Sequence, residues 1–560
     1  MKNEWLTIEN IDGELVLTKC SEEAEGEIVI PNGVMSIGGK AFYNCSGLTS
    51  ITIPESVKGI GSYAFCGCSS LASVVIPEGI ASIGEYTFSG CHSLTLVSIP
   101  QSVTAIDHSA FSVCSSLASI IIPDSVTSIN GGAFSGCNNL TSIVVSSGNK
   151  VYDSRNNCNA IIKTATNTLI RGCQNTIIPD SVTSIGSHAF SGCESLTSIV
   201  IPDSVTYIGI GAFWGCKGLA SIVIPDSVTS IRIGAFRECA GLISIVIPSR
   251  VTSIHNSAFR DCSSLSSIIV SSGNKVYDSR GKCNAIIETS TNTLICGCQN
   301  TIIPNSVTSI GRSAFKGCSS QTSITIPNSV TSIDYSAFSG CSGLTSITIP
   351  ESVTSIGEVA FTGCSSLSSV TIGNGVTSIG ESAFRGCSGL KSVIIGDHVT
   401  SIGACAFYDC SSLTSILIPD SITSIGDGAF YDCSSLTSIS IPDSVTSIGW
   451  VAFCGCSGLK SVSIPNSVKS IDIGAFSGCT GLTSIIIPDS VTSICPGVFK
   501  GCSGLTSVTC LAKNVPTTGY DVFYGLPKSS ATLYVPASAI EAYKAAEQWK
   551  EFGQILPISE

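Results

Sequence analysis

The chain has 560 residues, a length that ordinarily holds three or four domains of about 100–200 residues each. Only 12% of the residues are charged and the mean hydropathy is +0.43. Pro, Ser, Thr or Gly nevertheless interrupts every apolar cluster before the roughly 18–20 residues that a membrane-spanning helix needs. The net charge of -12 disfavours nucleic acids and anionic membranes, because both attract basic patches. We therefore expect no membrane insertion and no nucleic-acid partner.

Residues 1–30 are predicted to form an N-terminal β-hairpin cap. Apolar residues at 5–8 and 14–17 flank Asp12-Gly13, a dipeptide typical of tight hairpin turns. Much of the net negative charge lies here. The first residues contain no apolar segment typical of a secretory signal, so either the chain stays in the cytoplasm or its signal lies outside this sequence.

From residue 31 to residue 510 a unit of 23 residues recurs, as the spacing of Pro31, Pro54 and Pro77 illustrates. One unit reads Leu-x-x-Ile-x-Ile-Pro-x-x-Val-x-x-Ile-x-x-x-Ala-Phe-x-x-Cys. The two Ile residues before Pro alternate as in a strand, and Pro ends that strand because it has no N–H to donate. Val and Ile then predict a second extended piece, and Ala-Phe-x-x-Cys a short helical turn.

A single coil of 23 residues cannot bury its own apolar side chains, whereas stacked coils cover one another. Counting frame positions from 31 to 488 predicts an α/β repeat solenoid of about 20 coils with a parallel sheet, short strands elsewhere and a cap at each end. The unit closely resembles the BspA-like, Treponema-type leucine-rich repeat. This resemblance implies an arc with the parallel sheet on its concave face, and a role in adhesion and protein recognition at microbial surfaces.

Two units are enlarged to 33 residues, at 146–178 and 271–303. Both contain Ser-Ser-Gly-Asn-Lys-Val-Tyr-Asp-Ser-Arg, then Cys-Asn-Ala-Ile-Ile and Thr-Leu-Ile. Each is predicted to form a hairpin. The duplicated Asp-Ser-Arg is interpreted as a structural turn, because an enzyme needs one place that differs from the others.

Residues 511–560 are predicted to form a C-terminal cap of one strand at 531–535 and a helix. Ser538 and Glu541 form a capping-box pattern, and Ala542, Trp549 and Phe552 share one side of the helix. That side could be a membrane anchor or a partner helix. Balanced charges on the opposite side favour a plain cap that packs on the last coil.

The 29 cysteines have a largely repetitive origin, since eighteen occupy the last position of the unit, from Cys45 to Cys502. Stacked equivalents could approach disulfide distance, but we expect a buried ladder of free thiols. The five histidines are scattered, so we predict no metal and no cofactor. No nucleophile, base and orienting group can be matched by spacing, so no catalytic residue is predicted.

Residues that could recognise a partner occupy outward positions that the repeat leaves free. In the middle of the chain the outward strand position holds four consecutive β-branched residues, and two lysines interrupt the Thr and Ser column further on. On the loop side, aromatic residues occur that the repeat does not require. The tentative binding residues are Val200, Val223, Val246, Ile269, Lys391, Lys460, Trp214 and Trp450.

The leading hypothesis is a non-enzymatic recognition or adhesion solenoid, at a microbial surface or secreted, that binds a host or microbial protein through its sheet face. The alternative is a cytosolic interaction scaffold, which the absent signal segment and the unpaired thiols favour. A hydrolase is a remote alternative.

Overall fold

Each coil contributes two extended segments, which stack on those of the neighbouring coils in a computed structural model that describes residues 3–558. The Leu-x-x-Ile-x-Ile segment forms what we call the first layer, and a Ser-Ile pair forms the second layer. Neighbouring coils pair in parallel at the repeat spacing, so that Ile120 lies beside Ile143 and Ile347 beside Val370. The predicted solenoid is confirmed: residues 3–558 form about 24 turns, where the repeat predicts about 20 coils, and they contain almost no helix.

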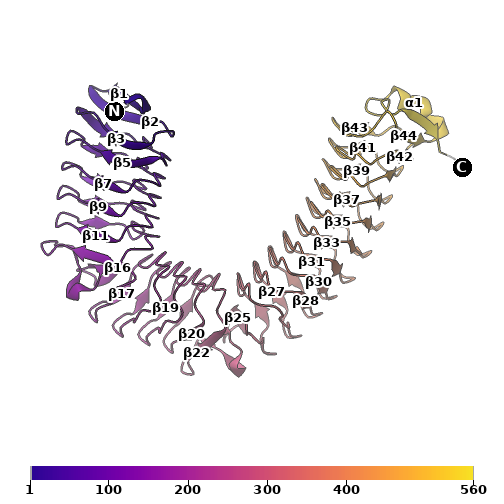
Figure 1. Cartoon of the computed structure of the whole chain (residues 1–560). Helices are drawn as coiled ribbons and strands as arrows, with labels where there is room; N and C mark the ends of the chain where they lie inside the picture. The colour runs from indigo at the N-terminus through magenta and orange to yellow at the C-terminus, as the bar shows by residue number, and fades with distance from the viewer. Residues whose placement is uncertain (1–2, 559–560) are drawn as a thin grey trace. The chain divides into compact units, whose positions relative to one another are not determined.

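The chain divides into two compact units, Met1–Asp278 and Ser279–Glu560, and within each the strands lie side by side (Figure 1). The first layer of unit 1 contains β3 (Gly26–Val29), β5 (Leu48–Thr52), β7 (Ser73–Val75), β9 (Leu96–Ser98), β11 (Ser119–Ile122), β13 (Ser142–Val145), β20 (Ser244–Ile247) and β22 (Ser267–Val270). Its second layer contains β1 (Leu6–Ile11), β2 (Glu14–Cys20), β4 (Val34–Ile37), β6 (Gly59–Ile60), β8 (Ser82–Ile83), β10 (Ala105–Ile106), β12 (Ser128–Ile129), β14 (Tyr152–Asp153), β15 (Ala160–Lys163), β16 (Thr168–Gly172), β17 (Ser184–Ile185), β18 (Tyr207–Ile208), β19 (Ser230–Ile231), β21 (Ser253–Ile254) and β23 (Tyr277–Asp278). The 3-10 turns are η1 (Asn3–Trp5) and η2 (Arg155–Asn157).

Unit 2 repeats the same two-layer arrangement. Its first layer contains β28 (Ser346–Ile349), β30 (Ser369–Ile372), β32 (Ser392–Ile394), β34 (Ser415–Ile416), β36 (Ser438–Ser440), β38 (Ser461–Ser463), β40 (Ser484–Ile487), β42 (Ser507–Cys510), β44 (Thr532–Val535) and β45 (Gln554–Pro557). Its second layer contains β24 (Ile286–Glu288), β25 (Thr293–Cys296), β26 (Ser309–Ile310), β27 (Ser332–Ile333), β29 (Ser355–Ile356), β31 (Ser378–Ile379), β33 (Ser401–Ile402), β35 (Ser424–Ile425), β37 (Ser447–Ile448), β39 (Ser470–Ile471), β41 (Ser493–Ile494) and β43 (Thr517–Thr518). The helical pieces are η3 (Arg280–Lys282), η4 (Ala537–Ala539) and α1 (Ile540–Ala545).

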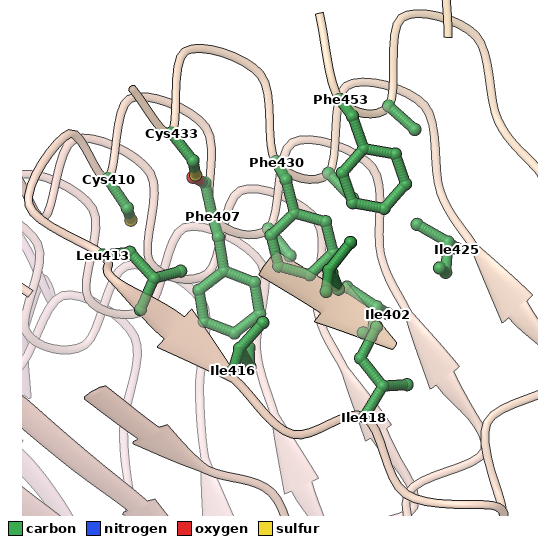
Figure 2. Packing of buried hydrophobic residues seen from close by; sticks show 14 of the residues in the cluster. Ile402, Phe407, Cys410, Leu413, Ile416, Ile418, Ile425, Phe430, Cys433 and Phe453 are labelled. Carbon is green, nitrogen blue, oxygen red and sulfur yellow. The ribbon is translucent and has the colours of Figure 1, made fainter. Parts of the chain in front are cut away.

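The core is a ladder in which each residue packs on its own equivalent in the next coil. Figure 2 shows Phe407, Phe430 and Phe453 in a row, and the ring centroids of adjacent pairs are 5.4 Å and 5.2 Å apart with nearly parallel planes. All three side chains are fully buried. Burying a phenylalanine is worth about 1.5–3 kcal/mol, so the ladder is a main source of the stability of a coil.

The Ala-Phe-x-x-Cys segment forms consecutive tight turns in place of the predicted short helical turn. Tyr63 and Gly67 have positive φ, which turns alternate peptide groups towards the next coil. The N–H groups of Tyr63, Phe65 and Gly67 therefore donate to carbonyls of the following coil, at 2.8–3.0 Å. The N–H groups between them close turns within their own coil. Backbone hydrogen bonds thus join the coils on this side as well.

Thiols and hydroxyls complete the links between coils. Most ladder thiols donate to the phenylalanine carbonyl of the preceding coil, as Cys68 Sγ does to Phe42 O at 3.1 Å. After the two hairpins, Cys193 and Cys318 face the carbonyls of Gly172 and Gly297 instead, at 3.9 Å. Along the first layer, Thr345 Oγ1 donates to Thr322 O, also at 3.1 Å. No cysteine between residues 3 and 558 belongs to a disulfide, and the ladder cysteines are buried apart from the half-buried Cys318. The expected buried ladder is confirmed.

The two enlarged coils form the predicted hairpins, because β15 pairs with β16 and β24 with β25 in antiparallel register. Each hairpin ends at a glycine on which the phenylalanine ring of the next coil rests. A Cβ at Gly172 would lie 2.2 Å from Phe190 Cε1, and one at Gly297 would lie 2.1 Å from Phe315 Cε1. Only glycine fits there.

The ends of the chain differ in detail from the sequence prediction. At the N-terminal end β1 and β2 form an antiparallel pair, and β3 already joins the first layer before residue 31. After residue 510, β44 and β45 extend that layer, so the predicted boundaries at 30 and 510 stay predictions.

The predicted C-terminal helix is short, and its predicted capping box is wrong, because α1 begins after Ala539 without a side-chain capping hydrogen bond. Ala546 is extended and ends the helix, so that the chain can return beside β44. Strand pairing here outweighs helix propensity. Trp549 and Phe552 are buried, and their rings meet Phe523 edge-on at 5.1 Å.

Candidate protein-recognition surface

The first-layer strands place their side chains alternately inwards and outwards, as the strand period requires. Ile201 and Ile224 are buried, whereas the residues just before them, Val200 and Val223, point to solvent. The two valines lie on neighbouring coils as a bridge pair. Four of the predicted binding residues therefore share one face of unit 1.

These residues belong to a longer row, which we call the apolar column. Its members and exposed fractions are Ile177 (74%), Val200 (82%), Val223 (77%), Val246 (47%) and Ile269 (51%). At about 4.8 Å between strands, five coils span roughly 19 Å. Ile177 was not predicted from the sequence, because the enlarged coil interrupts the spacing of 23. The signal was present, since Ile177 precedes Pro179 by two residues as Val200 precedes Pro202.

A second row beside the apolar column is also partly apolar. Where most coils have Thr after the strand's Leu, this part of unit 1 has Ala220 and Ile243. The Ile243 side chain is exposed, and its carbonyl accepts a hydrogen bond from Ser266 Oγ at 3.2 Å. The result is an exposed apolar patch whose margin consists of small hydroxyl residues.

The predicted lysines lie in the first layer of unit 2, whereas the apolar column belongs to unit 1. Lys391 and Lys460 are exposed, and their backbone groups keep the ladder intact: Lys391 N–H donates to Ser368 O, and Lys460 N–H to Thr437 O, each at 2.9 Å. Each lysine therefore adds a positive charge without disturbing the coil. The structure does not bring the two together, because the coils of Thr414 and Thr437 separate them.

The predicted tryptophans lie on the turn side of the coils. Trp214 is half-buried, with Arg237 Cζ 4.8 Å from its ring centre and the ring of His188 at 6.0 Å. It borders a shallow pocket of about 250 Å³ beside the ion pair of Lys217 with Glu194, whose atoms are 2.8 Å apart. Trp450, in unit 2, is exposed, and its backbone N–H donates to Asp427 Oδ1 at 2.8 Å.

Titratable groups on the turn side are perturbed mainly by burial. The pKa of His188 is lowered by burial and by the nearby charge of His108. Burial raises the pKa of the ladder thiols Cys91 and Cys433 to about 12. At neutral pH such thiols stay protonated, and a protonated thiol is a poor nucleophile. Within residues 3–558 no three His, Cys, Asp or Glu side chains are grouped so as to hold a metal ion.

The fold and the exposed face define a leucine-rich repeat solenoid. The family model described as a BspA-type leucine-rich repeat region, in six copies, matches residues 22–164, 169–280, 291–414 and 400–530. The chain therefore belongs to the BspA-type leucine-rich repeat family. Proteins with leucine-rich repeats typically bind other proteins, and BspA-type members are often associated with the cell surface.

Two of the solved structures that resemble the chain are bacterial repeat proteins. A leucine-rich repeat protein from Bacteroides ovatus is 26% identical over 88% of this chain and 95% of its own, with a TM-score of 0.34. A leucine rich cell surface protein from Faecalibacterium prausnitzii is 27% identical over 87% of this chain and 93% of its own, with a TM-score of 0.30. No curated protein matches the chain. No helix in the described part of the chain is long and apolar enough to cross a membrane.

Proposed function

We propose that the chain is a non-enzymatic recognition protein, exposed at a microbial surface or secreted, that binds a host or microbial protein through the apolar column of unit 1. The observation that carries the proposal is the run of five exposed β-branched side chains, Ile177 to Ile269, in one position of successive coils. The same position of unit 2 holds Thr or Ser in several coils, as at Thr348 and Ser440, so the fold does not require an apolar residue there.

The chemistry of this face fits a protein partner. Interface centres are depleted in charge and have a polar margin, and the column with Ala220 and Ile243 has that composition. β-Branched side chains have little rotamer entropy to lose when a partner covers them. A standard interface buries about 800 Å² per partner, so the column would be its centre and the surrounding Thr and Ser its margin.

The test uses the full chain, immobilised and exposed to solubilised microbial and host surface proteins, after which a captured protein is purified and its Kd measured. Replacing Val200, Val223 and Val246 together with Glu should weaken binding at least about 100-fold, because three charges would lose their water in the interface. The matched control replaces Ser440, Ser463 and Ile486, exposed in the same position of unit 2, with Glu. Undiminished binding by the valine variant, with the fold intact by circular dichroism, would contradict the proposed face.

A cytosolic interaction scaffold is the second candidate. The free thiols favour it, because a reducing compartment keeps cysteines in that state. Fractionation of the native cells, with thiol labelling of the denatured chain, separates the two. Oxidised cysteines in a surface fraction would exclude the scaffold, and fully reduced cysteines in a soluble cytosolic fraction would exclude surface display.

A further inference from the structure

One core position of unit 2 breaks the repeat. The strand of every 23-residue coil begins with Leu, as at Leu344 and Leu367, except in the coil that has Gln321. The Gln321 side chain is buried, and its Nε2 donates to Ser323 O at 2.5 Å. Its Oε1 is buried without a hydrogen-bond partner in the described structure. A polar group in this position is costly, and the strand that follows it is disturbed.

The disturbed segment is residues 323–326, which do not form a strand although their sequence is Ser-Ile-Thr-Ile, like that of β28. Ile324 is only half-buried, whereas Ile347, its equivalent in β28, is buried. β28 pairs with β30 on one side and is the edge of its sheet on the other. The first layer is therefore open between residues 323–326 and β28.

The first coils of unit 1 show how the backbone groups that face this opening can pair. Between the coils of Ile30 and Thr52, the Ile30 N–H donates to Thr52 O at 3.0 Å. The matching groups at the opening are the Ile326 N–H and the Thr348 carbonyl, and within the described residues they form no hydrogen bond with each other. Because N–H and C=O of one strand residue point to the same side, the Thr348 N–H also faces the opening.

The opening is a groove of about 800 Å³, with Ile324, Thr325, Ile326, Thr348, Glu351 and Gly373 among its lining residues. It is closed at one end, where Thr345 N–H donates to Thr322 O at 3.1 Å, and behind by the pairing of β27 with β29. Residues 323–326 lie along it. Hydroxyl and β-branched side chains line it, and Glu351 is the charged residue among them.

We infer that this groove binds a short extended polypeptide segment of a partner protein, about four residues long, by strand addition to β28. Backbone groups of the guest would pair with Thr348 and with Ile326, so affinity would depend mainly on the guest's main chain. Its side chains would be small or β-branched, and a Lys or Arg at the end near Glu351 would complement the carboxylate. The site lies in unit 2 and does not depend on the apolar column of unit 1.

The experiment uses the full chain and the fluorescein-labelled peptide Thr-Val-Thr-Val-Lys, with fluorescence anisotropy as the readout. Saturable binding is expected below about 1 mM, as for a weak strand-addition site. The same peptide with N-methyl groups on both Val nitrogens should bind at least about tenfold more weakly, because it has lost two N–H donors. Hydrogen exchange should slow at 324–326 and 346–349 when the unmodified peptide is present. Absence of saturable binding overturns the inference.

Variants of the chain test the same site. Gln321→Leu restores the repeat, is expected to close the opening, and should weaken peptide binding at least about tenfold while the chain stays folded. Glu351→Lys should weaken it about threefold. Glu358→Lys is the matched control, an exposed carboxylate of the same coil that lies outside the groove, and it should have no effect.

Three further outcomes would overturn the inference. They are equal binding by Gln321→Leu, equal binding of the N-methylated peptide, and exchange protection confined to the apolar column. A dimer of the chain that Gln321→Leu abolishes and that the peptide does not displace would assign the groove to a second copy instead of a partner protein.

Discussion

After the hairpin of β15 and β16, the first Leu position of the next coil is filled by Leu196, whereas after the hairpin of β24 and β25 the same position holds Gln321. Both hairpins loosen the first layer beside them. In unit 1 a groove of about 490 Å³ lies next to Val200, and in unit 2 the groove next to Ile324 reaches about 800 Å³. Residues 197–201 form no strand, as residues 323–326 form none, but Val200 keeps a bridge to Val223 on the next coil, whereas residues 323–326 have no such bridge. The two regions thus differ in what they offer a partner, apolar side chains in unit 1 and main-chain groups in unit 2.

The largest loss of stability is expected at the glycine that ends each hairpin, a feature that both regions share. Gly172→Ala and Gly297→Ala each place a methyl group within 2.2 Å of a phenylalanine ring. We expect a loss of about 4 kcal/mol in the free energy of unfolding for either variant, because the next coil must move away from the hairpin. Urea titration followed by hydrogen exchange of each unit measures it. Gly59→Ala, whose new methyl group would lie 3.7 Å from its neighbour, is the control and should be nearly neutral.

The hairpins differ most at the residue before that glycine. Arg171 is buried, and its Nη1 donates to Ser191 O at 3.1 Å, whereas the equivalent Cys296 is half-buried. Arg171→Cys makes the first hairpin like the second. It should destabilise unit 1 by about 3 kcal/mol, because it leaves a cavity and a carbonyl without its donor. Cys296→Ser is the matched variant, and a comparable loss in unit 2 would contradict this account.

Exchanging Leu and Gln between positions 196 and 321 tests directly whether this position causes the difference between the two units. Leu196→Gln should destabilise unit 1 by about 2 kcal/mol, since it replaces buried hydrocarbon with an amide. It should also speed hydrogen exchange at residues 198–201. Gln321→Leu should stabilise unit 2 by about 1 kcal/mol. If both variants change stability in the same direction, the difference between the units does not originate at this position.

Alkaline pH tests the thiol ladder that both units contain. Burial raises the pKa of Cys91 to about 12 from an ordinary value of 9.0. The folded chain therefore holds the proton more tightly than the unfolded chain. The stability this contributes is complete below pH 9 and is lost as the pH rises towards 12. Cys91→Ala should reduce the slope of unfolding free energy against pH by about 1.4 kcal/mol per pH unit in that window. An unchanged slope would show that this thiol is not buried.

The repeat made most of the fold predictable from the sequence. Spacing alone located the strands, the two hairpins and the buried thiols, because each position recurs in an equivalent environment. The outward position of Val200 and Ile269 followed from the strand period. Those inferences needed only local pattern and the requirement that coils cover one another.

What could not be predicted depends on contacts between coils. The positive φ of Tyr63, a residue that seldom adopts it, becomes favourable only because its N–H reaches the next coil. The helix after Ser538 was overestimated, because the pairing of β45 with β44 requires the chain to return early. Gln321 was visible as an exception to the repeat, but the loss of pairing in the strand after it was not.

The links between coils join like positions: Phe to Phe, Ser-Ile to Ser-Ile, and thiol to the Phe carbonyl one coil earlier. A coil at the end of a run of regular coils can therefore unfold without disturbing any coil beyond its immediate neighbour. Under a pulling force the regular coils of β29 to β41 should detach one at a time, each releasing 23 residues, or about 75 Å of extended chain. Such a chain would dissipate mechanical load in equal steps, so that it could extend under force while it remains bound at both ends.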